Sequence, residues 1–374
     1  MKKITHKCLA FLGLILGYGH LIAQVTNTGL MDMTPGEKIG NLRIGAYIDA
    51  YYGYDFGSPE DGNIPYFASM NRHNEATINL AFVDVRYQSE RIRGRFVPGF
   101  GTFINANNQS EPGSLKNILE GSVGFRPFAK KDIWIDFGVL GSPYTNESAV
   151  SRDHLMYTRS FAPEYVPYYL AGGKVTLPLS GKLTAYLYLL NGWQQIQDQN
   201  EGKSLGTQLE FRPNGKNLFN WNTYIGDERS ELNPDNRIRY FTDIYWIYND
   251  GKKWSFTSSA YIGLQETVQN RPTSEGIWWQ GNFIARYTFT ELLSVSGRVE
   301  YFWDPSRIQI VPVTPAEKFR TFSSGLALNV SPATNLMFRF EGRYFLSQDA
   351  VFFDAQQNPT DSKLWMISNV TFSF

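Results

Sequence analysis

The feature that most constrains this chain is a period-two alternation of apolar and polar residues, which runs through most of its 374 residues. In residues 41–54, Ile44 and Ile48 fall on one face, whereas Arg43 and Asp49 fall on the other. Because successive side chains of a strand point to opposite faces, this pattern predicts strands with one apolar face. Sixteen segments show it: 41–54, 74–87, 91–103, 119–128, 131–140, 168–179, 182–190, 204–213, 217–226, 237–248, 253–264, 277–289, 291–303, 318–330, 334–346 and 364–374.

The connectors between these segments alternate in length. Those after even-numbered segments are short, such as Ser180-Gly181. Those after odd-numbered segments are long and polar: 55–73, 104–118, 141–167, 191–203, 227–236, 265–276, 304–317 and 347–363. This alternation is typical of outer-membrane barrels, which have tight periplasmic turns and long extracellular loops. The sequence therefore predicts an all-β fold, a single transmembrane antiparallel up-and-down β-barrel of about 16 strands over residues 41–374.

Segment 74–87 departs from the regular pattern. Its apolar residues switch from the parity of Ile78 to that of Val83 and Tyr87. An extra residue in one strand shifts the parity of everything after it. We therefore expect a β-bulge near Phe82.

A secreted β-sandwich or β-propeller is the main alternative to a membrane barrel. A sandwich is expected to divide into domains of about 100 residues, and the chain shows no linker. A propeller is expected to repeat every 40–45 residues or so, and no such repeat is present. The pattern favours the membrane barrel.

The N-terminus carries the features of a cleaved signal peptide over residues 1–23. A basic start precedes an apolar core at 9–16, and Ala23 is a small residue at the expected cleavage point. Cys8, the single cysteine, precedes the core, so lipid attachment is not expected and the mature chain has no disulfide. No later apolar run approaches 18 residues, so the mature chain can cross a membrane only as a closed barrel. Residues 24–40 would form a short periplasmic segment.

Composition agrees with this placement. Basic and acidic residues number 35 each, and without basic tracts this balance argues against nucleic-acid binding. Cleavage after residue 23 leaves 32 basic against 35 acidic residues, a net charge of −3. The 27 Phe, 22 Tyr and 9 Trp residues suit interfacial aromatic girdles, with Tyr52, Tyr54, Trp221, Trp246 and Tyr248 as examples.

The chain ends in an alternating segment, Val370, Phe372 and the terminal Phe374, that resembles the C-terminal signal of outer-membrane barrels. Residues 160–165 (SFAPEY) and 186–193 (YLYLLNGW) resemble the OmpL-like β-barrel porins of Bacteroidota. The resemblance implies a Gram-negative outer membrane, with its lipid and lipopolysaccharide, and recognition by the barrel-assembly machinery. It also implies passive diffusion of small hydrophilic solutes, with a homotrimer or a monomer equally allowed.

The inward face predicted by parity carries fourteen basic and nine acidic side chains, which predicts a mild preference for anions. Charge on this face is tolerated because it faces water, not lipid. The pore-lining candidates are Arg43, Asp49, Arg91, Arg93, Arg95, Arg126, Arg237, Arg239, Asp243, Arg298, Glu300, Arg339, Glu341 and Arg343.

Two features of this interior have alternatives that the sequence leaves open. Arg91, Arg93 and Arg95 step along one strand face, either as a track for anions or as a wall ladder paired with neighbouring acids. The third and longest loop, 141–167, is the constriction candidate by analogy with general porins. Its candidate residues are Glu147, Asp153 and Glu164.

No catalytic site, metal site or cofactor is expected. The mature chain keeps two histidines, His73 and His154, on different loops, and no cluster of metal ligands. A substrate-specific channel for sugars or anionic solutes, or a non-conducting adhesin or assembly scaffold, remains the alternative. Four inward tyrosines either stack sugars or fill space: Tyr186, Tyr188, Tyr224 and Tyr245.

Overall fold

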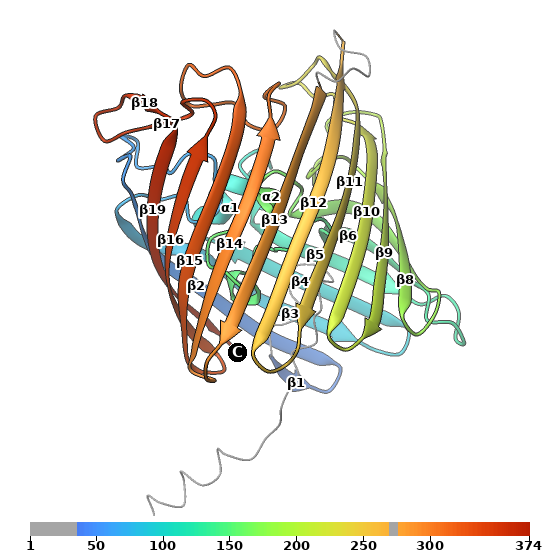
Figure 1. Cartoon of the computed structure of the whole chain (residues 1–374). Coiled ribbons are helices and arrows are strands. Elements are labelled where there is room, and N and C mark those ends of the chain that lie inside the picture. Colours follow the sequence, from blue (N-terminus) through green and yellow to red (C-terminus); the bar gives the residue numbers. More distant parts are fainter. Residues whose placement is uncertain (1–35, 269–275) are drawn as a thin grey trace, which may run out of the picture.

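The computed structural model describes residues 36–268 and 276–374, and its strands close into one antiparallel barrel (Figure 1). Sixteen strands form the wall in sequence order, and β19 pairs with β2 to complete the ring, with Asn369 opposite Tyr51. The wall strands are β2 (Leu42–Asp55), β3 (Glu75–Gln88), β4 (Ile92–Phe100), β5 (Ile118–Phe125), β6 (Trp134–Gly141), β7 (Tyr169–Pro178), β8 (Leu183–Leu190), β9 (Ser204–Asn214), β10 (Asn217–Asp227), β11 (Asn236–Asn249), β12 (Trp254–Thr267), β13 (Ile277–Thr288), β14 (Leu293–Asp304), β15 (Phe319–Ala333), β16 (Leu336–Ser347) and β19 (Ser362–Ser373). The predicted fold class is confirmed.

Short elements occur between and before the wall strands. They are β1 (Glu37–Ile39), α1 (Thr102–Asn107), η1 (Gly113–Asn117), η2 (Ser151–Asp153), α2 (Phe161–Glu164), β17 (Phe352–Phe353) and β18 (Pro359–Thr360). β1 forms a hairpin with β2, so the end of the expected segment 24–40 joins the sheet. The predicted signal peptide, 1–23, lies outside the described residues. Within the described ranges, no helix is long and apolar enough to cross a bilayer.

The strand predicted over 91–103 is shorter than expected. β4 ends at Phe100 because Gly101 adopts a φ of +129°, and a Cβ there would lie 2.3 Å from the carbonyl oxygen of Asn79. Only glycine tolerates this backbone conformation and this close approach. The chain then turns into α1 instead of continuing the strand.

The bulge expected near Phe82 lies at Asn79. Asp49 of β2 pairs with Leu80 while the next residue, Ala50, pairs with Ile78, so Asn79 is the extra residue. Asn79 and Leu80 are both fully buried on the inner face. The position near Phe82 was predicted from the apolar residues alone. The extra residue of the bulge is the polar Asn79, which precedes Phe82.

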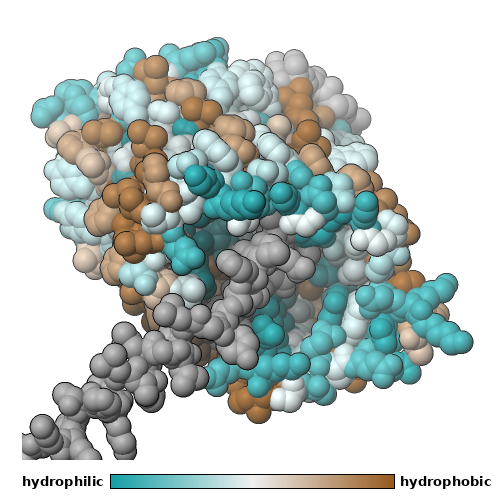
Figure 2. Space-filling view, turned by 60° about the horizontal axis from the view of Figure 1, so that its bottom comes forward, coloured by the Kyte–Doolittle hydropathy of each residue, from teal (hydrophilic) through white to brown (hydrophobic). Residues whose placement is uncertain are grey.

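The two faces of the wall differ in polarity. Large apolar side chains such as Phe96, Ile244 and Phe340 project outward and are more than half exposed. An exposed apolar surface of this kind is stable against lipid rather than water. Figure 2 shows the short-turn end, where hydrophilic residues surround a hollow and hydrophobic residues lie on the flank.

Aromatic rings form rows near both ends of the outer face. At the short-turn end, ring neighbours follow one another across five strands: Phe211, Phe219, Trp246, Phe256 and Phe283, with centroids 6.0–6.4 Å apart. At the long-loop end, Trp279 stacks on Trp303 at 6.2 Å. Such rows suit the two interfaces of a bilayer, where rings contact both apolar and wet layers.

Candidate solute pathway

The third long connection, residues 142–168 between β6 and β7, lies inside the barrel. We call it the lumen loop. It carries η2 and α2, and Figure 1 shows α2 enclosed by the wall strands. Met156, Tyr157 and Arg159 of this loop are fully buried. The lumen is therefore not an empty cylinder but is filled in large part by one segment of the chain.

Acidic side chains of the wall hold the backbone of the lumen loop. Glu341 Oε2 accepts the Tyr157 N–H at 2.8 Å, and Asp243 Oδ2 accepts the Thr145 N–H at 2.8 Å. Glu300 Oε2 accepts the first N–H of α2 at 2.6 Å. Loop N–H groups without strand partners need acceptors, and charged acceptors contribute roughly 1.5–3 kcal/mol each.

Arginines of the wall donate to carbonyl oxygens of the same loop. Arg339 Nη1 lies 2.6 Å from the Ser151 oxygen, and Arg343 Nη1 lies 2.7 Å from the Arg159 oxygen. Arg298 Nη1 contacts a third loop carbonyl at 2.6 Å. These arginines are at most 2% exposed. We predicted from the sequence that these arginines line a water-filled passage. In the structure they instead hold the lumen loop against the wall.

Asp49 joins two wall strands to the lumen loop. Its carboxylate accepts hydrogen bonds from Ser151 Oγ and the Tyr157 hydroxyl, both at 3.0 Å. It also accepts from the amides of Asn79, the bulge residue, and Asn369. Asp49 is therefore a buried junction and does not line a passage as predicted.

Two of the three predicted constriction residues, Glu147 and Glu164, act within the packed interior. Glu147 accepts the Ser160 N–H at 3.0 Å, and Glu164 Oε2 accepts the Ala68 N–H of the first long loop at 2.8 Å. Burial raises the pKa of both carboxyl groups. Asp153 lies in η2 and is half-buried. Glu147 and Glu164 thus stabilise the loop conformation.

Aromatic side chains pack together in the lumen near the long-loop end. Trp193, from the fourth long loop, lies 4.9–5.8 Å from the rings of Tyr144, Tyr224 and Phe241. We call these four residues the aromatic layer. All four tyrosines considered for sugar stacking, Tyr186, Tyr188, Tyr224 and Tyr245, are buried, and Tyr186 also borders the cavity described below.

Arg239 lies beside the aromatic layer instead of facing a passage. Its guanidinium sits 4.9 Å from the Trp193 ring centroid and 5.4 Å from that of Trp278. Its Nε donates to Gln265 Oε1 at 2.8 Å. Stacking between two indoles and a charged hydrogen bond compensate for burying this cation.

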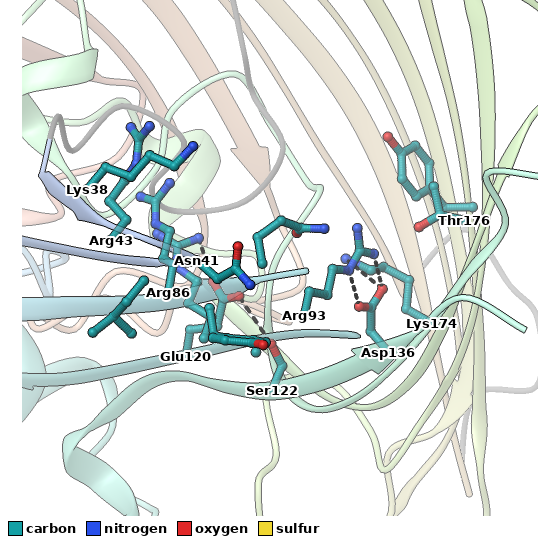
Figure 3. A pocket seen from close by; sticks show the side chains of 16 residues that line it. Lys38, Asn41, Arg43, Arg86, Arg93, Glu120, Ser122, Asp136, Lys174 and Thr176 are labelled. Atoms are coloured by element: carbon teal, nitrogen blue, oxygen red, sulfur yellow. Dashed lines mark hydrogen bonds and ion pairs between the residues drawn. The ribbon is translucent and has the colours of Figure 1, made fainter. Parts of the chain in front are cut away.

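A polar cavity of 530 Å³ opens at the short-turn end (Figure 3). Its charged lining comes from β1 to β7: Lys38, Arg43, Arg86, Arg93, Arg95, Glu120, Asp136 and Lys174. Of the fourteen predicted pore-lining residues, Arg43, Arg93 and Arg95 border it. We take this cavity as the candidate entrance for solutes.

Two arginines of the predicted ladder are paired with acids from neighbouring strands. Arg93 binds Asp136 of β6 with Nε and Nη2, at 2.6 and 2.5 Å, across Gly124 of β5. Arg95 binds Asp84 and Glu120 at 2.9–3.1 Å. This is the arrangement of a paired wall ladder, so these arginines do not form a simple track.

The remaining candidates lie near the ends of the barrel. Arg91 precedes β4 and donates to the Pro127 carbonyl at 3.1 Å, and Arg126 lies 3.4 Å from Glu90 in the adjoining turn. Arg237, at the long-loop end, donates to the Pro234 carbonyl at 2.9 Å. These three side chains therefore lie at the two rims of the barrel, Arg91 and Arg126 at the short-turn end and Arg237 at the long-loop end.

Sequence reasoning missed Arg86, which borders the cavity, and its partner Asp84. Both follow the bulge, so they fall on the face opposite Val83 and Tyr87 and hence inside. The switch of apolar residues from even to odd positions in segment 74–87 was therefore enough to predict that Asp84 and Arg86 point inward. Across residues 36–268 and 276–374, no group of three or more His, Cys, Asp or Glu side chains is placed to hold a metal ion.

Solved structures of bacterial channels share this architecture. The outer membrane channel DcaP of Acinetobacter baumannii has a TM-score of 0.58 at 9% identity, covering 91% of this chain and 99% of its own. The anion-selective porin from Comamonas acidovorans has a TM-score of 0.57 at 9% identity, covering 89% and 99%. OprB of Pseudomonas putida has a TM-score of 0.59 at 8% identity, covering 89% and 94%. At these identities the likeness shows the fold alone.

Comparison of the sequence itself identifies the family. No curated protein matches the chain. The model described as "Putative beta-barrel porin-2, OmpL-like" matches residues 41–374, which is the whole barrel. The chain therefore belongs to this OmpL-like porin family and is an outer-membrane β-barrel protein of the Gram-negative type.

Proposed function

We propose that this porin is a diffusion channel for small hydrophilic solutes and that it prefers anions. The observation that carries the proposal is the cavity at the short-turn end, whose lining has six basic and two acidic side chains. An excess of one charge sign in a concave site raises the local concentration of counter-ions. The fold shared with the anion-selective porin from Comamonas acidovorans supports the channel part of the proposal, not the ion preference.

The lumen loop sets the width of the passage in this proposal. It fills the space along β11, β14 and β16, so solutes would pass along the opposite wall, where Arg93, Ser122 and Lys174 are partly exposed. Glu147, Asp153 and Glu164 would act by holding the loop rather than by presenting charge to the solute.

Reversal potential tests the selectivity. In a planar bilayer with a potassium chloride gradient, the wild-type protein should carry current with a reversal potential displaced toward that of chloride. The reason is the positive excess at the cavity. Clear cation selectivity would contradict the preference for anions.

A non-conducting barrel that acts through its loops, as an adhesin or assembly scaffold, is the second candidate. The aromatic layer favours it, because its packed rings occupy part of the lumen near the long-loop end. The two candidates differ in one measurement: a scaffold gives no single-channel current, whether the lumen loop is present or shortened.

The proposed partners follow from the family and the fold. We propose that the barrel-assembly machinery recognises Val370, Phe372 and Phe374; the two phenylalanines are exposed on the outer face. Lipid and lipopolysaccharide would contact the apolar flank. A homotrimer is proposed from the likeness to general porins, and native mass spectrometry in detergent would distinguish it from a monomer.

A further inference from the structure

A second cavity, of 330 Å³, lies at the long-loop end of the barrel, and we call it the mouth cavity. Its lining comes from the first, seventh and eighth long connections and from the adjoining ends of β2 and β19. Figure 1 shows β17 and β18 of the eighth connection above β19 at this end. The volume is at the lower end of the roughly 300–1,000 Å³ of small-molecule sites, which suits a ligand of one or two rings.

Two long connections contact each other to form one wall of the mouth cavity. A Cβ on Gly57, in the first connection, would lie 2.4 Å from the carbonyl oxygen of Phe353, in the eighth, so this close approach requires glycine. Gln357 Nε2 donates to the Gly57 and Ser58 carbonyl oxygens at 3.3 and 3.1 Å. These contacts fix the wall before any ligand binds, and a preformed site has a lower ordering cost on binding.

The floor of the mouth cavity carries a buried ammonium group. The Lys363 side chain is 2% exposed, and its Nζ lies 2.6 Å from Asp55 Oδ2, which balances its charge. The ring centroids of Phe345 and Phe352 lie 6.0 and 5.9 Å from Nζ. Within the described ranges, however, no atom accepts a well-directed hydrogen bond from this ammonium, which has three N–H donors. A buried donor without an acceptor is costly, so the floor favours a ligand with an acceptor atom.

The outer part of the mouth cavity combines carboxylates with apolar side chains. Glu60 and Asp61 of the first connection are exposed. Asp61 accepts the backbone N–H and the side-chain amide of Asn63, both at 2.9 Å, which fixes the turn that carries it. Phe353 is half-buried and Val313 is exposed on the lining. The cavity therefore offers hydrogen-bond donors at its floor, acceptors at its rim and apolar surface on its walls.

We propose that the mouth cavity binds a neutral carbohydrate. A hydroxyl group both donates and accepts, so one hydroxyl can accept from Lys363 at the floor and another can donate to Glu60 at the rim. The C–H face of a sugar ring can pack against the Phe353 ring. Mixed polar and apolar linings of this kind are usual in small-molecule sites, where a few polar groups fix the orientation of the ligand.

The charges of the lining disfavour ionic ligands. An anionic ligand would meet three carboxylates, those of Asp55, Glu60 and Asp61, and an amine that reaches the floor would meet Lys363. Neutral hydroxyl groups avoid both conflicts. The inference goes beyond the proposed function and does not depend on it, because binding at the mouth is measured without any current and a non-conducting barrel could also bind sugar.

Saturation-transfer NMR on the folded protein tests the binding. The protein is kept in a polyoxyethylene detergent, because detergents with sugar head groups would compete. D-Glucose, D-galactose, D-mannose and maltose are the neutral probes, and D-glucosamine and D-glucuronate are charged analogues. At least one neutral sugar should show saturable transfer, and both charged analogues should bind more weakly than it does. Absence of transfer to every neutral sugar, or a preference for a charged analogue, would overturn the inference.

The variant Phe353→Ala tests the apolar wall. It should weaken binding of the best neutral sugar roughly tenfold, because the packing surface for the sugar ring is lost. Phe56→Ala is the matched control, since Phe56 is 47% exposed in the same connection and is not part of the lining. Its affinity should equal that of the wild type. Equal weakening in both variants, or none in Phe353→Ala, would place the sugar elsewhere and overturn the site.

The double variant Asp55→Asn/Lys363→Met tests the floor. It removes both charges of the buried pair together, so no unpaired ion is left behind. Binding should weaken roughly tenfold because the ammonium donors are lost. Arg320→Met/Asp349→Asn is the matched control, because it removes an ion pair at the same end of the barrel outside the lining. Unchanged binding in the floor variant would overturn the role of Lys363, and if that variant does not fold, Phe353→Ala decides.

Discussion

Gly124 is the residue whose missing side chain permits the main ion pair of the cavity. A Cβ at this position would lie 2.1 Å from Asp136 Oδ1 and 3.1 Å from Arg93 Cγ. Gly124→Ala should therefore disrupt the Arg93–Asp136 pair and lower the free energy of unfolding by about 1–3 kcal/mol. The measurement is the midpoint of urea unfolding in micelles. Gly281→Ala, with no atom near its Cβ, is the control, and equal shifts in both variants would contradict the argument.

Residue parity predicts which side chains point inward but not what they meet. Arg298, Arg339 and Arg343 do point inward, as their alternation with apolar neighbours indicates. Their partners include carbonyl groups of the lumen loop, more than a hundred residues away in sequence. A local pattern contains no information on such a distant contact. For this reason the inner face was predictable and the role of these residues was not.

The lumen loop contains a buried histidine, His154, that links its seating to pH. Burial, with Arg159, Arg339 and Arg286 nearby, holds the pKa of His154 well below its ordinary value of 6.5. The ring is therefore neutral in place, and its Nε2 accepts the Ser148 N–H at 2.7 Å. The displaced loop takes up a proton below pH 6.5 and the seated loop does not, so acid weakens the seating.

Channel recordings from pH 7.5 to pH 5 test this. The wild-type current should rise, or fluctuate more, as the pH falls below about 6.5, the ordinary His pKa. His154→Gln removes the titrating group while keeping a side chain that can accept a hydrogen bond. Its current should change less across this range. An identical pH response in both proteins would assign the effect to other groups.

Among the elements, strands were predictable and inward turns were not. Each of the sixteen alternating segments coincides with a wall strand because lipid and lumen impose opposite polarities on its two faces. β4 stops early because Gly101 must approach the bulge at Asn79, which is a contact between two strands. Helices α1 and α2 are short and lie in loops, where neither face meets lipid. Period-two reasoning therefore has no signal for them.

At the scale of the whole molecule, the lumen loop lies against wall side chains of both charge signs in equal number. The wall side chains that face the loop include four basic residues, Arg286, Arg298, Arg339 and Arg343, and four acidic ones, Asp49, Asp243, Glu300 and Glu341. The cavity at the short-turn end lies on another part of the wall, and its lining has six basic and two acidic side chains. In the proposed function, selectivity and width would therefore depend on different parts of the molecule.

Removing residues 144–160 from the lumen loop separates these two properties. Conductance should increase by roughly twofold or more, since a sixteen-stranded barrel has room for an aqueous channel once it is emptied. Anion preference should decrease, because solutes would then also meet the charge-balanced wall. Single-channel current and reversal potential measure both quantities. Shortening the exposed connection at 231–235 is the control and should change neither. The wall strands close their own hydrogen-bonded ring without the loop, so the variant should still form a barrel. An unchanged conductance in this variant would therefore mean that the loop does not limit the passage.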